Sequence, residues 1–296
     1  GQSKIATKAQ VRTASKNVAG GMFRYCPPLH ISAKEEGELG TPEYRQFFHN
    51  EKGEKVSPWH DIPLYSGNEM SVETGEMIIN YVCEMPRGTN QKMEMATKEE
   101  WNPILQDTKK GKLRYIKWSP MLFNYGFAPQ TFEDPNVVHP KLKLKGDGDP
   151  LDVCDIGKRP CMRGEVVRAR VLGCLAMIDE GELDWKLLVC NIDDPAVRKL
   201  SDITQVEKHK PGAEYAVREY FRNYKTPDGK PLNEFGFDEK FLNKEAAYEV
   251  LNETKEMWQK LVDNPVDGFT NKRAGEVKPL YDIPTKDNPR GLPQNK

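Results

Sequence analysis

The 296-residue sequence lacks both a long apolar run and an excess of charge of either sign. Its longest apolar stretch, 171-VLGCLAMI-178, is far shorter than the roughly 20 residues that a membrane-spanning helix needs. The 44 basic and 45 acidic residues give a net charge of −1, so no global field attracts the chain to nucleic acid or to an anionic membrane. We therefore expect a soluble protein whose partners include neither nucleic acid nor membrane.

Cysteine and histidine are few, and neither follows a metal-binding pattern. The six cysteines form no C-x-x-C pair and the five histidines no H-E-x-x-H motif, which argues against a zinc site. A chain of this length buries a sizeable core without needing a disulfide framework. We therefore expect reduced thiols, mostly in the core, at Cys26, Cys83, Cys154, Cys161, Cys174 and Cys190.

Two common phosphate-binding motifs are also missing. The sequence contains neither G-x-x-x-x-G-K-S/T nor G-x-G-x-x-G. Their absence argues against a P-loop and against a dinucleotide-binding fold.

The first 34 residues contain no acidic residue but six basic ones. Four of these, Lys4, Lys8, Arg12 and Lys16, recur at every fourth position, which is the spacing of one helix face. This composition is typical of an organellar presequence and equally of a disordered basic arm. We predict that residues 1–40 form an N-terminal arm. We also predict a plastid or mitochondrial location, with the cytoplasm as the alternative.

Apolar periodicity predicts strands in the middle of the chain and helices after them. Gly173 interrupts the longest predicted strand, as expected where a strand bends at a barrel corner. Strands followed by helices indicate a mainly β (α+β) fold, with a small antiparallel barrel flanked by two amphipathic helices. The catalytic domain would span residues 41–262, followed by an extended proline-containing tail at 263–296. The predicted strands are 77–85, 92–96, 113–118, 164–179 and 184–193, and the predicted helices 213–224 and 247–261.

Four aspartates, Asp147, Asp149, Asp152 and Asp155, fall within nine positions of 145-KGDGDPLDVCDIG-157. Carboxylates this close repel one another unless a cation lies between them. An EF-hand calcium loop would need an oxygen side chain at its fifth position and Glu at its twelfth, where this chain has Leu151 and Lys158. Oxygen ligands without His or Cys favour Mg²⁺, Mn²⁺ or Ca²⁺. A solvated acidic loop is the alternative.

A second acidic cluster occupies 179-DEGELDWK-186. A hairpin there would bring Asp179 and Asp184 to one end of the barrel, with Asp184 and Lys186 on a shared face. Alone, this segment is an ordinary charged turn. Beside the first cluster it would extend one basin of carboxylates. Two or more cations in such a basin can clamp the attacking and leaving oxygens of a displacement at phosphorus.

A phosphate substrate would also need fixed cations and hydroxyl groups. The candidates are Lys92, Arg114, Tyr125, Tyr224 and Lys225. Each has an ordinary alternative, because such lysines and arginines are often surface charges and such tyrosines often lie at the edge of a core.

At this point six blocks of the sequence resemble the soluble family I inorganic pyrophosphatases, especially the larger eukaryotic type. The D-x-D-P-x-D signature of that family matches 147-DGDPLD-152. The other blocks occur in the family's order and spread over roughly residues 60–250. They are 84-EMPRGTNQKMEM-95, 105-LQDTKKGKLR-114, 124-NYGFAPQTFEDP-135, 179-DEGELDWK-186 and 221-FRNYKTPDGKP-231.

The resemblance implies an OB-like five-stranded barrel, hydrolysis of pyrophosphate with several Mg²⁺ ions (Mn²⁺ as a substitute) and a homodimer. It implies that Asp147, Asp152 and Asp184 hold the first metal and that Asp152 is shared with a second. A third ion would bind Asp179 with Asp184, and a fourth Glu94. Asp149 would be the general base, with Glu84 supporting the network. The phosphates would contact Lys92, Arg114, Tyr125, Lys186, Tyr224 and Lys225, while Asp155 matches no functional position.

Two residues depart from the family pattern. Met121 stands where a tyrosine is expected, four residues before Tyr125, in a segment shorter than the eukaryotic-type pattern. Gly88 stands where an aromatic residue is expected after Pro86-Arg87. Neither departure removes a proposed metal ligand, so an active enzyme is predicted. The alternatives are an inactive pyrophosphatase-like scaffold and an OB-type binding protein.

Overall fold

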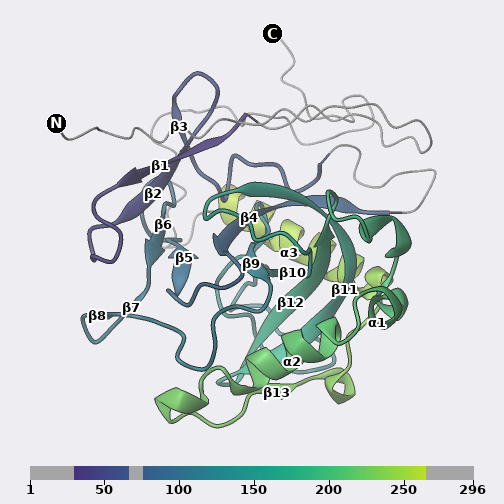
Figure 1. Ribbon diagram of the computed structural model, residues 1–296. Helices are drawn as coiled ribbons and strands as arrows, with labels where there is room; N and C mark the ends of the chain where they lie inside the picture. Colours follow the sequence, from purple (N-terminus) through teal and green to yellow (C-terminus); the bar gives the residue numbers. More distant parts are fainter. Residues whose placement is uncertain (1–29, 67–75, 265–296) are drawn as a thin grey trace, which may run out of the picture.

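The computed structural model describes residues 30–66 and 76–264, and its centre is a ring of five strands (Figure 1). The strand order is β12-β10-β9-β4-β11, and β11 closes the ring by pairing with β12. The predicted five-stranded barrel is therefore confirmed. It is not wholly antiparallel, because β10 and β12 run parallel. The strands are β4 (Ile78–Met85), β9 (Asn124–Phe127), β10 (Asp152–Asp155), β11 (Val166–Asp179) and β12 (Glu182–Asn191), with β13 (Glu234–Phe235) on the edge of β11.

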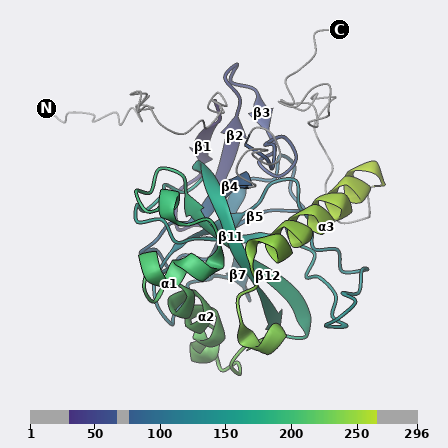
Figure 2. The same cartoon turned by 90° about the vertical axis from the view of Figure 1, so that its right-hand side faces the viewer.

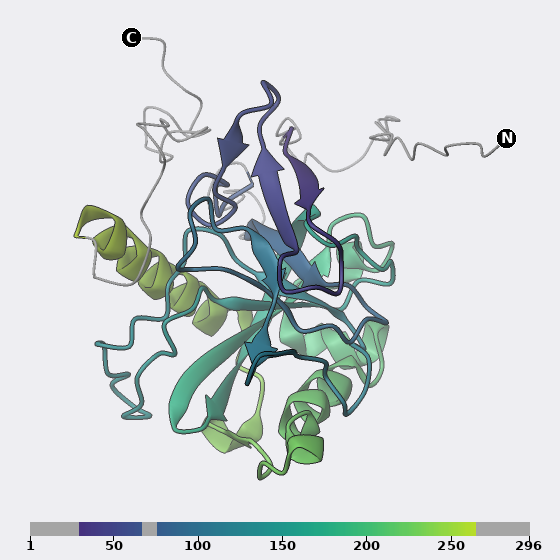
Figure 3. The same cartoon turned by 90° about the vertical axis from the view of Figure 1, so that its left-hand side faces the viewer.

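A second, N-terminal sheet was not predicted, although its strand β5 confirms the predicted strand 92–96. Its order is β1-β2-β6-β5, with β3 on β2. The strands β1, β2 and β3 lie at the opposite end of the molecule from α2 (Ala213–Asn223), whereas β5 contacts the ring strand β4 (Figure 3). Each of its strands is at most five residues long, too short for alternation to stand out among turn residues. The strands are β1 (Ser32–Glu36), β2 (Arg45–His49), β3 (Lys55–Val56), β5 (Met93–Met95) and β6 (Ile104–Gln106), beside a hairpin of β7 (Thr108–Lys109) and β8 (Lys112–Leu113).

Two predictions about this half of the chain need correction. The predicted strand 113–118 is wrong beyond Leu113. Only an isolated bridge at Tyr115 follows, because the next backbone groups pair with loop residues such as Asn90 instead of a neighbouring strand. The predicted arm 1–40 contains β1, which pairs with β2, so residues 32–36 belong to the sheet. The rest of the arm up to residue 29, and the tail from residue 265, lie outside the described residues.

Both predicted amphipathic helices are confirmed. They are α2 (Ala213–Asn223) and α3 (Lys244–Asp263), and the Asn243 side chain caps α3 by accepting a hydrogen bond from Ala246 N at 3.1 Å. Figure 2 shows α3 crossing the strands of the ring. No helix in the described part of the chain is both long and apolar enough to span a bilayer. The short helical turns are η1 (Val197–Lys199), η2 (Ile203–Gln205), α1 (Val206–His209), η3 (Thr226–Asp228) and η4 (Phe237–Glu239).

The long strand β11 changes register at Gly173, as predicted. The pairing with β12 shifts between Val171 and Gly173. A Cβ atom at Gly173 would lie 2.3 Å from the carbonyl oxygen of Leu242. That backbone is held close by a pair of hydrogen bonds between Cys174 and Leu242. Glycine is therefore required where another segment approaches the bulge.

Alternate side chains of the ring strands enter two apolar clusters. Val153 and Leu187 pack in the cluster that includes the first half of α3. Cys154 and Leu188 pack in the cluster that includes α2. Successive strand residues point to opposite faces, so Asp152 and Lys186 share the face covered by α2. The acidic segments therefore meet on that side of the ring.

The described cysteines are free thiols buried in the core, as predicted. Cys26 lies outside the described residues.

Candidate active site

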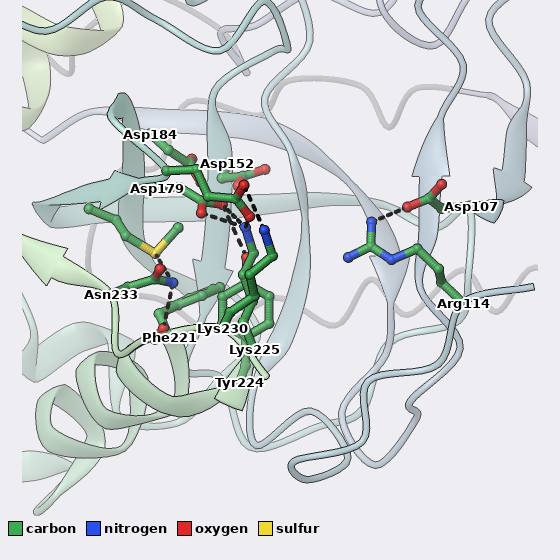
Figure 4. A network of polar contacts seen from close by, with 12 residues as sticks. Asp107, Arg114, Asp152, Asp179, Asp184, Phe221, Tyr224, Lys225, Lys230 and Asn233 are labelled. Atoms are coloured by element: carbon green, nitrogen blue, oxygen red, sulfur yellow. Dashed lines mark hydrogen bonds and ion pairs between the residues drawn. The ribbon is translucent and has the colours of Figure 1, made fainter. Parts of the chain in front are cut away.

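One cleft gathers every residue that the sequence analysis assigned to the site. It encloses about 500 Å³ between the ring strands, the N-terminal sheet and the end of α2. Figure 4 shows Asp152, Asp179 and Asp184 together, with the Arg114 guanidinium facing them from the opposite side. The shared location is as expected, whereas the individual roles stay predictions. The predicted residues in the lining are Glu84, Lys92, Glu94, Arg114, Tyr125, Asp147, Asp149, Asp152, Asp179, Asp184, Lys186, Tyr224 and Lys225.

Asp152, the first residue of β10, lies at the centre of a charged group. The parallel pairing of β10 with β12 sets it opposite Lys186. The Lys186 ammonium donates to both Asp152 and Asp184, and the Tyr125 hydroxyl donates to Asp152 Oδ2 at 2.5 Å. Burial alone would lower the pKa of Lys186, but Asp152 and Asp184 raise it well above its usual value. Lys186 is thus an internal cation that offsets two carboxylates.

The β11–β12 hairpin brings the second acidic cluster to the same cleft, as predicted. Asp179 ends β11, and Asp184 lies on β12. Lys225 Nζ donates to Asp179 Oδ2 at 2.6 Å, and the Tyr224 hydroxyl donates to the same oxygen at 3.3 Å (Figure 4). Tyr224 and Lys225 directly follow α2. The end of this helix therefore supplies a cation and a hydroxyl to the acidic hairpin.

The opposite wall of the cleft is built by the N-terminal sheet and its hairpin. Lys92 Nζ donates to Glu94 Oε2 at 2.8 Å, and the Arg114 guanidinium pairs with Asp107 (Figure 4). Lys92 N donates to Arg114 O, and Arg114 N to Asp107 O. Asp107 was not assigned from the sequence, although it lies in the same block as Arg114. In the sequence, its position directly before the β7–β8 hairpin was the only feature that could have indicated a role.

Glu84 connects the ring to the N-terminal sheet. It lies on β4, and its Oε1 accepts a hydrogen bond from Met95 N of β5 at 2.6 Å. Burial raises the pKa of Glu84 well above its usual value, and Lys92 opposes that shift. Glu84 thus links the ring to the wall that carries Lys92, and its supporting role stays a prediction.

Glu133 is a further acid near the site that the sequence analysis did not assign. Ligand oxygens of Glu133, Asp147 and Asp184 lie within 4.8 Å of one another. Glu133 Oε1 accepts from Trp185 N at 2.9 Å, and the Glu133 backbone pairs with Gly148 and Asp149. The residue stood inside the block 124–135, beside the apolar Phe132. An acid in that setting signals a buried carboxylate with a specific partner.

Crowding changes the acidity of Asp147 and Asp149. Burial and the neighbouring Asp149 raise the pKa of Asp147 to about 7. Burial and Glu94 raise the pKa of Asp149 to about 7. Burial also raises the pKa of Glu133 and of Asp184 well above their usual values. The cleft therefore contains more negative charge than its own lysines neutralise.

This donor set fits hard divalent cations. Among the described residues that line the cleft, the ligand atoms are carboxylate oxygens, and none is a histidine or cysteine. Mg²⁺ and Mn²⁺ prefer such oxygen ligands. The raised pKa values are a second sign of fit, because a divalent cation would relieve the repulsion between the carboxylates.

We expect the affinity for Mg²⁺ to rise with pH between about pH 6 and 8. In the metal-free protein Asp147 and Asp149 have pKa values of about 7, above the usual 3.8. The folded chain therefore keeps protons there that the unfolded chain releases near pH 4, and the metal-free fold loses stability as pH rises from about 4 to 7. Metal binding must displace these protons, so its affinity should rise up to about tenfold per pH unit for each proton released. Calorimetric titration with Mg²⁺ would measure it, and an affinity constant from pH 6 to 8 would contradict the assignment.

Asp155 is not part of the cleft. Its side chain is fully buried and accepts hydrogen bonds from Gly157 N, Asn191 N, the Tyr81 hydroxyl and Asn124 Nδ2. Burial raises its pKa, and these donors oppose the shift. Three of the four clustered aspartates thus face the cleft, and the fourth is a structural residue, as predicted. Four hydrogen bonds stabilise it in the core.

The two departures from the family pattern lie in contact with one another. Gly88 N donates to Met121 O at 2.8 Å, and Met121 N donates to Thr89 O at 2.8 Å. Met121 is buried and lines the cleft, where it contributes an apolar thioether in place of a hydroxyl.

Comparison with known proteins gives consistent matches. The family model described as inorganic pyrophosphatase matches residues 81–259. An inorganic pyrophosphatase from Debaryomyces hansenii is 48% identical over 79% of this chain and 80% of its own. The soluble inorganic pyrophosphatase 6, chloroplastic, of Arabidopsis thaliana is 45% identical over 80% of this chain and 76% of its own.

A solved structure of similar shape is an N-terminally truncated vacuolar soluble pyrophosphatase of Trypanosoma cruzi in complex with PPi. It has a TM-score of 0.74 and 38% identity, over 88% of this chain and 100% of that chain. Fold, cleft and sequence agree with the resemblance found first in the six blocks. The chain belongs to the inorganic pyrophosphatase family.

Proposed function

We propose that this protein is an inorganic diphosphatase that hydrolyses pyrophosphate to two orthophosphates with Mg²⁺ as its cofactor. The observation that carries this proposal is the composition of the cleft, where carboxylates able to hold cations lie beside cations and hydroxyls able to hold phosphate. The family membership supports the same reaction. An OB-type nucleic-acid module would need a basic groove with exposed aromatic residues, and this cleft is acidic.

The carboxylates would divide among several cations. Asp147, Asp152 and Asp184 would hold the first Mg²⁺, and Asp152 would also hold a second. Asp179 with Asp184 would hold a third and Glu94 a fourth, with Mn²⁺ as a substitute. Bound cations of this kind supply positive charge to the phosphoryl oxygens and acidify the attacking water.

Asp149 would accept the proton of the attacking water. Its side chain lines the cleft next to Asp147, and Asp149 N donates to Asp147 Oδ1 at 3.0 Å. Burial and Glu94 raise its pKa when no cation is near, and bound Mg²⁺ would lower it again, so that the carboxylate is free to accept a proton.

Lys92, Arg114, Tyr125, Lys186, Tyr224 and Lys225 would bind the phosphates. In the metal-free cleft Lys186 and Lys225 are paired with aspartates. Once other cations neutralise those carboxylates, the two ammonium groups are available to phosphate oxygens. The metal ions would therefore bind the carboxylates first, and the released lysines would then bind the phosphates.

We also propose a homodimer, and a plastid or mitochondrial location with the cytoplasm as the alternative. The dimer follows from the resemblance to eukaryotic-type relatives. The location follows from the basic composition of residues 1–34, and the chloroplastic relative is consistent with it.

Phosphate release from pyrophosphate tests the proposed activity directly. We expect rapid release with Mg²⁺ and none above background when EDTA removes the metal, because without it the carboxylates repel the substrate. If the folded protein binds Mg²⁺ but releases no phosphate, the protein is an inactive pyrophosphatase-like scaffold and this proposal is wrong. Met121→Tyr would then be the first substitution to test for a gain of activity.

A further inference from the structure

A second, smaller cavity lies next to the carboxylate cluster. It is open to solvent and has a volume of about 160 Å³ between α3, the segment 133–146 and the start of β12, with Val137 and Glu253 exposed at its edge. Its walls are largely apolar, and its lining includes no lysine or arginine among the described residues. The apolar lining residues are Val137, Pro140, Leu144, Leu183, Trp185, Val250 and Met257. Ligand pockets for drug-sized molecules start near about 300 Å³, so this cavity suits a molecule with a single ring.

The wall of this cavity is shared with the acidic trio Glu133, Asp147 and Asp184. Glu133 itself lines the small cavity and not the large cleft, although its carboxylate belongs to the trio. Leu183 and Trp185 line the cavity on either side of Asp184 in the chain. The small cavity and the large cleft therefore lie on opposite faces of the same stretch of β12.

The shared wall is tightly built. Gly146 lines the cavity just before Asp147, and a Cβ there would lie 2.4 Å from Glu133 O. Trp185 N is held by Glu133 Oε1 at 2.9 Å. These contacts connect the wall of the cavity to the backbone next to Asp147 and Asp184.

The charges around the cavity are acidic. Glu253 and Asp134 line it together with Glu133. Asp134 Oδ1 accepts from Asn136, while Glu253 makes no ion pair with a described residue. His139 Nδ1 accepts from Leu142 N at 3.1 Å, and burial and Lys141 lower the pKa of His139. An occupant with a positive charge would meet carboxylates and no opposing cation in the lining.

We propose that this cavity binds a small amphipathic cation, with an apolar ring between Trp185 and Met257 and an ammonium group near Glu253 and Asp134. We further propose that its occupation weakens the binding of divalent cations at the acidic trio. A positive charge next to Glu133 reduces the attraction of that carboxylate for a second cation. The inference depends on the metal site and not on hydrolysis, so a failure of either can be recognised separately.

The probe for this site is 2-phenylethylamine, titrated calorimetrically into the full chain with and without saturating Mg²⁺. We expect binding to the metal-free protein, weakened about fivefold or more by Mg²⁺. The affinity for Mg²⁺ should fall by the same factor at saturating amine, because coupling between two sites is reciprocal. The carboxylate 3-phenylpropionate carries the same ring and should not bind. Absence of amine binding, or equal binding of the carboxylate, would overturn the proposed site, and an unchanged Mg²⁺ affinity would overturn the coupling.

Variants on α3 locate the bound amine. Glu253→Lys reverses the charge at the cavity, and Met257→Trp fills it. Each should weaken binding of the amine about tenfold or more, the loss expected for a hydrogen-bonded charged partner or a blocked space. Glu256→Lys makes the same charge change on an exposed position of α3 outside the lining and should leave binding unchanged. Equal weakening by Glu256→Lys, or full binding in Glu253→Lys, would show that the amine binds elsewhere, for instance in the large cleft.

Discussion

Replacing Asp149 by Asn should lower kcat for pyrophosphate hydrolysis by about 10²-fold or more. Asparagine has the size of aspartate but cannot accept the proton of the attacking water, and general-base catalysis typically contributes 10²–10⁴-fold. Asp149 faces the cleft and its burial beside Glu94 raises its pKa to about 7. The loss should appear in kcat rather than KM, because the proposed phosphate ligands are unchanged. Initial rates of phosphate release in saturating Mg²⁺ measure it.

Asp155→Asn is the matched control, with the same chemical change in the same acidic run. Asp155 lies in the core, where it accepts four hydrogen bonds. This variant should lose stability while its folded fraction keeps nearly the wild-type kcat. If the folded Asp155→Asn protein loses as much kcat as Asp149→Asn, the division of the run into catalytic and structural acids is wrong.

The second large effect should follow from Lys186→Met. Lys186 is almost wholly buried, with Asp152 and Asp184 as its partners. Removing one partner of a buried ion pair typically costs about 3–5 kcal/mol, because the other charge is left without compensation. We expect a loss of that size in the free energy of unfolding of the metal-free protein, measured by urea denaturation. Saturating Mg²⁺ should restore much of it, because the cation supplies the missing positive charge.

Lys225→Met makes the same substitution at a more accessible pair. The side chains of Lys225 and Asp179 are 16% and 19% exposed, so water compensates part of the lost charge. The expected destabilisation is at most about 1 kcal/mol. Equal losses in the two variants, or no recovery of Lys186→Met by Mg²⁺, would argue against Lys186 as the internal cation of the metal-free cleft.

The sequence predicted most of the charged residues of the cleft, but it did not show which distant segments meet there. The D-x-D-P-x-D run and the acidic hairpin were visible because each is local, and local spacing decides which side chains share a face. Glu133 was missed because its partners, Asp147 and Asp184, come from other segments. Asp155 was set apart by comparison with the family, and its four hydrogen-bond donors explain why an acid in the core needs no metal.

The fold was predicted to a similar extent. The long strand β11, its bulge at Gly173 and the two helices have strong periodic patterns, and all are present. The parallel pairing of β10 with β12 depends on a contact between segments far apart in the chain, which no local pattern contains. In the N-terminal sheet only β5 was predicted, as the strand 92–96, and the other strands are too short for their alternation to be recognised.

The position of Glu84 between the two sheets has a consequence for thermal inactivation. Asp152 and Asp184 stand on the ring, whereas Lys92, Glu94 and Arg114 belong to the N-terminal half of the cleft, and the Glu84–Met95 hydrogen bond joins the two parts. Regions of one protein can open at different free energies. If the short N-terminal strands separate first on heating, the enzyme loses its substrate-binding cations while the ring is still folded. Activity would then disappear at a lower temperature than the main loss of the near-UV aromatic signal, and replacing Glu84 by Gln would widen the gap between the two midpoints.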